Sequence, residues 1–114
     1  MKQMKWILLA FCLIMVTTAF AQTASTTIFK VYGNCSTCKK HIETAALAAG
    51  AAKADWNKDT KMLTLVYDPA KTNVDNVQKR IAAAGYDTPK FRGDDKAYGK
   101  LDECCQYDRK TANQ

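Results

Sequence analysis

The chain has 114 residues, and its 17 Lys and Arg against 11 Asp and Glu give a formal net charge of +6 at pH 7. The charges are interspersed and form no long basic run, so the sequence gives no support for nucleic-acid binding. A chain of this length is expected to form one small domain with a modest core.

The N-terminal segment has the parts of a secretory signal peptide. Two lysines precede an apolar run over residues 6–16, and the small residues Ala19 and Ala21 suit cleavage after Ala21. The run is shorter than the about 20 apolar residues that a membrane-spanning helix needs, which disfavours the alternative of a retained anchor. We therefore expect residues 1–21 to be removed on export, leaving a secreted, periplasmic domain with four cysteines.

Strand-like and helix-like patterns alternate along the rest of the chain. In order they predict a strand at 26–32, a helix at 36–49, strands at 52–56 and 62–67, a helix at 74–84 and a short strand at 88–91. This order is typical of an α+β ferredoxin-like βαββαβ sandwich, with a four-stranded antiparallel sheet and two helices on one face. We expect this domain to occupy residues 22–92, followed by a C-terminal tail at 93–114.

Cys35 and Cys38 lie where the first predicted strand ends and the first predicted helix begins. Two cysteines with this spacing at a helix start can direct both sulfurs to one point, and the free N–H groups and the helix dipole favour thiolate. Lys39 and Lys40 are expected to lower the pKa of these thiols by proximity, unless they are simply surface charges. Because thiolates bind metals and also attack disulfides, the pair indicates a soft-metal site or a redox dithiol.

Several motifs together resemble the heavy-metal-associated domain family. They are the Gly-x-Cys-x-x-Cys loop after the first strand, Asp68-Pro69 after the hairpin, and the run from Ile81 to Tyr86 that closes the second helix. The family comprises small copper chaperones, N-terminal domains of metal-transporting ATPases and a secreted mercury-binding protein. The resemblance covers residues 26–91, and some secreted bacterial members share the Cys-Cys tail.

The resemblance implies a metal carrier and not an enzyme. Cys35 and Cys38 would hold the ion, and Tyr86 would lie near it in the loop after the second helix. The implied partner is a metal-transporting membrane protein or another metal-binding domain, and the implied state is a monomer or a metal-bridged dimer. Asn34 replaces the aspartate that zinc-selective members often carry, which favours a monovalent soft ion.

The two loop cysteines suit Cu(I) best. Soft thiolates prefer Cu(I), and two of them hold it with an open side for an incoming thiolate. Zn(II) requires four ligands in a tetrahedron, of which the loop supplies two. Hg(II) is also soft and accepts two thiolates, so a mercury scavenger is an alternative to a Cu(I) carrier, and Zn(II) is a weaker one.

Cys104 and Cys105 in the tail join the site if the tail folds back over the loop. One of two adjacent cysteines joins more easily than both, because directing both sulfurs to one ion strains the backbone. A vicinal disulfide, a bridge to another chain and a separate thiol site are the alternatives. His41 flanks the core position Ile42 and is expected to face solvent.

A thiol-disulfide oxidoreductase is the rival class. It shares the Cys-x-x-Cys pair at a strand-to-helix junction, and Thr88-Pro89 is similar to a dipeptide near thioredoxin active sites. However, two consecutive strands follow the first predicted helix, whereas a thioredoxin pattern alternates strand and helix there.

Overall fold

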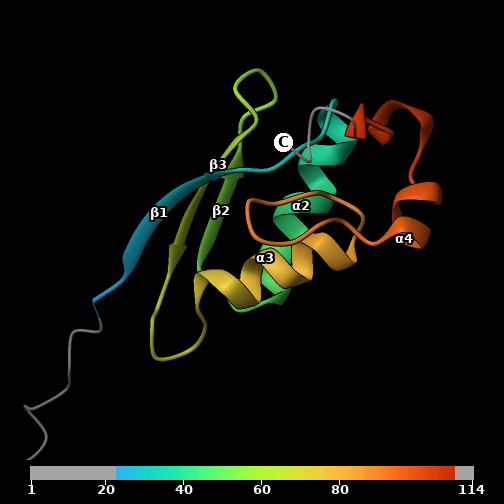
Figure 1. Cartoon of the computed structure of the whole chain (residues 1–114). Helices are drawn as coiled ribbons and strands as arrows, with labels where there is room; N and C mark the ends of the chain where they lie inside the picture. Colours follow the sequence, from blue (N-terminus) through green and yellow to red (C-terminus); the bar gives the residue numbers. More distant parts are fainter. Residues whose placement is uncertain (1–22, 110–114) are drawn as a thin grey trace, which may run out of the picture.

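The computed structural model describes residues 23–109, in which an antiparallel sheet carries two long helices on one face (Figure 1). The elements are, in chain order, β1 (Ser25–Lys30), α2 (Ser36–Ala48), β2 (Lys53–Trp56), β3 (Met62–Tyr67), α3 (Val74–Ala83), α4 (Asp95–Gly99) and the short 3-10 helix η2 (Glu103–Cys105). The α+β class expected from the sequence is confirmed. Within the described residues, no helix has the length and apolar character that crossing a bilayer requires.

Strand β3 lies in the centre of the sheet and pairs antiparallel with β1 on one side and β2 on the other. Phe29 of β1 and Trp56 of β2 both face Leu63 of β3 across these pairs. All three side chains are buried, whereas Ile28, the neighbour of Phe29, is 58% exposed. Because successive side chains of a strand point to opposite faces, this alternation gives the sheet one apolar face for the helices.

Helices α2 and α3 cover that face with Ile42 and Ile81, which are fully buried. The amide oxygen of Asn73 caps α3 by accepting the Asn76 backbone N–H at 2.8 Å. Gly50 follows α2 and Gly85 follows α3, with φ angles of +103° and +104°. Residues with a side chain rarely adopt this conformation, so each glycine fixes where its helix ends.

The expected fourth strand at residues 88–91 is not formed, and the sheet of the described residues has three strands. The segment turns instead, because the backbone N–H of Thr88 donates to the carbonyl of Phe91 at 2.9 Å. Pro89, in the middle, has no N–H to offer to a neighbouring strand. Asp87, the residue before this segment, accepts the backbone N–H of Tyr32 through its carbonyl at 3.1 Å, which links the chain there to the residues after β1.

Residues 93–109 pack against the domain beside the start of α2 (Figure 1). The Asp87 carboxylate, which is 1% exposed, accepts the backbone N–H of Gly93 and pairs with the Arg109 guanidinium at 3.0 Å. Arg109 also donates to the Gly93 carbonyl and to the Asp95 carboxylate, each at 2.7 Å. A buried carboxylate needs such partners, so Asp87 holds both ends of this segment, which we call the docked tail.

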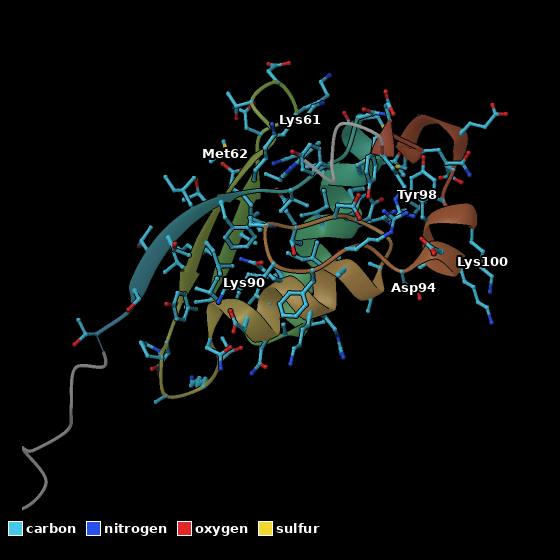
Figure 2. All side chains as sticks on the ribbon, viewed as in Figure 1. Lys61, Met62, Lys90, Asp94, Tyr98 and Lys100 are labelled. Carbon is cyan, nitrogen blue, oxygen red and sulfur yellow. The ribbon has the colours of Figure 1, made fainter. Side chains whose placement is uncertain are left out.

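Aromatic packing fixes the docked tail further. The Tyr107 ring stacks on Tyr32 and Tyr86, with centroids 6.3 and 6.2 Å apart, and Tyr98 of α4 (labelled in Figure 2) meets it edge-on at 5.2 Å. The Tyr107 hydroxyl accepts the Asp87 N–H at 2.8 Å, and the Tyr98 hydroxyl donates to the Tyr107 carbonyl. The tail therefore has buried contacts of its own and a defined position.

We predict that Arg109→Ala destabilises the protein by about 3 kcal/mol, because it leaves the Asp87 carboxylate buried without its cation. The free energy of unfolding is measured by urea denaturation of the reduced protein. Arg92→Ala is the matched control, since Arg92 forms only an exposed pair with Asp95 at 3.4 Å; its effect should stay below about 0.5 kcal/mol. Equal effects of the two variants would show that the buried pair does not hold the tail.

Candidate metal centre

Cys35 and Cys38 occupy the start of α2, as their spacing predicts. Cys35 is the N-cap residue, with extended backbone, and Cys38 lies in the first turn. The Cys38 sulfur accepts the backbone N–H groups of Asn34 at 3.3 Å and Cys35 at 3.4 Å. The Cys35 and Cys38 sulfurs lie 3.3 Å apart, so the helix start directs both of them to one point.

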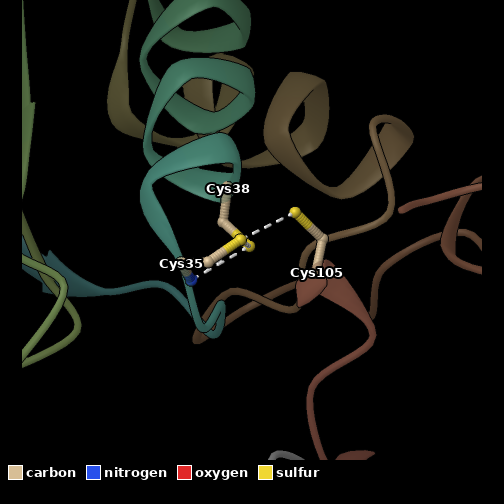
Figure 3. A group of neighbouring side chains, drawn as sticks. All are labelled: Cys35, Cys38 and Cys105. Carbon is tan, nitrogen blue, oxygen red and sulfur yellow. Dashed lines mark hydrogen bonds between the residues drawn. The ribbon is translucent and has the colours of Figure 1, made fainter. Parts of the chain in front are cut away.

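A third sulfur comes from the docked tail. Cys105 of η2 places its sulfur 3.4 Å from that of Cys35, and the sulfurs of Cys35, Cys38 and Cys105 all lie within 4.8 Å of one another. Figure 3 shows the three side chains converging from the start of α2 and from η2. Cys38 and Cys105 are buried and Cys35 is partly buried. We call these three residues the inner triplet.

Cys104 lies outside the inner triplet although it precedes Cys105 directly. Its sulfur is 2.7 Å from that of Cys35 and 3.9 Å from that of Cys105, and its side chain is exposed. All four cysteines of the described chain carry free thiols. The tail thus folds back over the loop, and its two cysteines take different positions, one in the cluster and one at its solvent side.

Tyr86, expected near the site, is fully buried beside the cluster. Burial raises the pKa of Tyr86, and hydrogen bonding to Cys105 raises it further, so the phenol keeps its proton. Its hydroxyl also lies 2.8 Å from Nδ1 of His41. His41 is exposed, as expected, but its contact with Tyr86 was not foreseen. The spacing of His41, three residues after Cys38 on one helix side, was the available signal.

The pKa values of Cys35, Cys104 and Cys105 shift in different directions. Burial alone would raise the pKa of Cys35, but hydrogen bonds from Cys104, Cys38 and Cys105 outweigh it and lower this pKa to about 6. Burial and the hydrogen bond with Cys38 raise the pKa of Cys105. The bond with Cys35 raises the pKa of Cys104. Cys35 is therefore a thiolate at neutral pH, surrounded by the other sulfurs.

Lys39 does not have the role expected for it. Its ammonium contacts the Glu43 carboxylate at 2.6 Å and the Asp55 carboxylate at 2.7 Å. The Lys39 charge is thus compensated by two acidic groups. Hydrogen bonds from the neighbouring sulfurs lower the pKa of Cys35. The alternative given for this lysine, a surface charge, is the better description.

Several solved structures are similar to this chain, among them the following three. Comparison with protein-family models and with curated proteins finds no match. The CopZ metallochaperone is 32% identical, with 98% of it and 56% of this chain covered and a TM-score of 0.53. Oxidized MerP from Ralstonia metallidurans CH34 is 31% identical, with 94% of it and 58% of this chain covered and a TM-score of 0.54. The N-terminal domain of the zinc(II) ATPase ZiaA in its apo form is 36% identical, with 68% of it and 60% of this chain covered and a TM-score of 0.50.

These structures match the classes named by the sequence resemblance, namely chaperones and ATPase N-terminal domains. The similarity covers nearly all of CopZ and MerP at more than 30% identity. It is accompanied by the sheet with two helices and by sulfurs gathered at the start of α2. This chain therefore belongs to the heavy-metal-associated domain family.

Proposed function

We propose that the protein is a Cu(I) carrier that holds the ion through the thiolates of Cys35, Cys38 and Cys105. The observation that carries this proposal is the convergence of these three sulfurs within 4.8 Å in a partly buried position. Three thiolates suit a soft monovalent ion, whereas a structural Zn(II) site takes four ligands in a tetrahedron. Cys104, the nearest source of a fourth ligand, lies outside the inner triplet.

Transfer of the ion to a partner proceeds by thiolate exchange. A partner thiolate adds to the ion, a protein thiolate leaves, and no bond to carbon changes, so the protein acts as a carrier and not as an enzyme. Cys35 supports capture because it is already deprotonated at neutral pH. The similarity to an ATPase N-terminal domain supports a metal-transporting membrane protein, or another metal-binding domain, as the partner.

The affinity for Cu(I) tests this proposal. In anaerobic titrations of the reduced protein against competing chelators, we expect tight binding of one Cu(I) and weaker binding of Zn(II). Cys105→Ser should lower the Cu(I) affinity by about 100-fold, about 2.7 kcal/mol, because a hydroxyl is a poor ligand for a soft ion.

Met62→Leu serves as the control, because it removes a sulfur of β3 outside the cluster, and it should bind Cu(I) like the parent protein. A parent protein that binds no Cu(I) tightly would contradict the carrier function. Tighter binding of Hg(II) than of Cu(I), in the same titration, would favour a mercury scavenger on the same three thiolates.

The reactivity of Cys35 is expected to depend on pH. Only the thiolate is alkylated, and a lowered pKa means that Cys35 stays a thiolate down to about pH 6. The iodoacetamide reaction of Cys35 in the metal-free protein should therefore be half-maximal near pH 6 and slow below it. The rate is followed by mass spectrometry of the peptide that contains Cys35.

Cys104→Ala removes the first of the hydrogen bonds that lower this pKa. Its alkylation profile should shift upward, toward the ordinary cysteine value of about 8.5. Glu103→Ala, a change at the neighbouring exposed residue, should leave the midpoint where it is. A profile near pH 8.5 in the parent protein would refute the thiolate assigned to Cys35.

Export to the periplasm is part of the proposal, although residues 1–21 lie outside the described residues. In a Gram-negative host that produces the full chain, we expect the protein in the periplasmic fraction with Gln22 as its first residue, read from the intact mass. Leu8→Arg interrupts the apolar run and should keep the chain uncleaved in the cytoplasm. Uncleaved parent protein in the membrane fraction would instead indicate a retained anchor.

A further inference from the structure

The four sulfurs form two groups of three, and both groups contain Cys35 and Cys105. In the inner triplet, the sulfurs of Cys35 and Cys105 lie 3.4 Å apart and Cys38 is the third member. The sulfur of Cys104 lies close to the same two sulfurs, 2.7 Å from that of Cys35 and 3.9 Å from that of Cys105. We call Cys35, Cys105 and Cys104 the outer triplet. Each triplet brings three soft ligands within reach of one ion.

The two triplets differ in exposure. The inner triplet is completed by Cys38, which is 0% exposed, and the outer triplet by Cys104, which is exposed to solvent. An ion in the inner triplet has two buried ligands, Cys38 and Cys105. An ion in the outer triplet has one ligand at the protein surface, where a partner thiolate can reach it.

We propose that Cys104, with Cys35 and Cys105, forms a second metal position through which the ion leaves the inner triplet. This inference rests on the proposed carrier function and adds a path to it. The Cys104 thiol loses its proton to solvent and its thiolate adds to the ion, after which the Cys38 thiolate leaves. One metal–sulfur bond forms and one breaks, and the oxidation state of the ion does not change.

The surroundings of both cysteines suit this exchange. After release, the Cys38 sulfur keeps the two backbone N–H groups of Asn34 and Cys35 as partners, so a buried thiolate is not left without hydrogen bonds. Cys104 and Cys105 belong to the docked tail and are fixed in position with it. The ion therefore changes position by exchanging one sulfur, while the tail stays attached through Arg109 and Asp87.

The test compares the rate of Cu(I) transfer with the affinity. The parent protein, Cys104→Ser and Cys105→Ser are loaded with one Cu(I) without oxygen and mixed with the chelator bicinchoninate in a stopped-flow instrument. We expect Cys104→Ser to release the ion at least about tenfold more slowly than the parent protein, with an affinity reduced far less than in Cys105→Ser. Glu103→Ser, in the same exposed turn, is the matched control and should behave like the parent protein.

A second variant examines the outer position directly. Cys38→Ser removes the inner triplet and leaves the outer one, so it should still bind one Cu(I) through three sulfurs, counted by X-ray absorption. Adding Cys104→Ser to it should abolish that three-sulfur coordination.

Three results would overturn the outer position while leaving the carrier function intact. The first is unchanged release by Cys104→Ser, and the second is two-sulfur coordination in Cys38→Ser. The third is an affinity loss in Cys104→Ser as large as that in Cys105→Ser, which would make Cys104 a primary ligand. A parent protein that binds no Cu(I) would overturn the carrier function itself, and this inference with it.

Discussion

The buried pair of Asp87 and Arg109 is the interaction on which the metal centre depends. A carboxylate that is 1% exposed cannot be left without a cation and hydrogen bonds, and here the C-terminal segment supplies both. The pair therefore couples burial of Asp87 to docking of residues 93–109. Tyr107 then stacks on Tyr86, and η2 comes to lie against the start of α2.

Docking of the tail changes the chemistry of the loop that characterises the family. The loop alone offers two sulfurs, which hold a soft ion in open, nearly linear coordination. Cys105 adds a third sulfur from the far end of the chain, which favours retention of the ion. The cluster also places hydrogen bonds around the sulfur of Cys35, which lower its pKa, whereas burial raises the pKa of Cys105. Tail and loop thus form one site, although the sequence resemblance ends at residue 91.

The sequence predicted most of what local patterns encode. Alternation and helical spacing identified the three strands and the two long helices, because these patterns depend on neighbouring residues. The prediction of a fourth strand at residues 88–91 was wrong, because Pro89 and the turn around it outweigh the weak strand-like alternation of this segment. Asp87 and Arg109 lie 22 residues apart in the sequence, and no periodic pattern links them. The sequence therefore could not predict where the tail docks. The place of Tyr86 came from the family resemblance, whereas its contact with His41 needed the structure.

The proposed carrier has to hold its ion against loss and still release it, and adjacent cysteines in a 3-10 helix suit both needs. With about three residues per turn, neighbouring side chains point about 120° apart, so Cys104 and Cys105 approach Cys35 from different sides. One is buried with Cys38 and the other reaches the surface beside Cys35. Had the pair lain two or more residues apart in an extended tail, nothing in the backbone would tie the exposed sulfur to the buried one. In the proposed carrier, their adjacency makes the ligand that would retain the ion and the one that would pass it outward parts of a single turn.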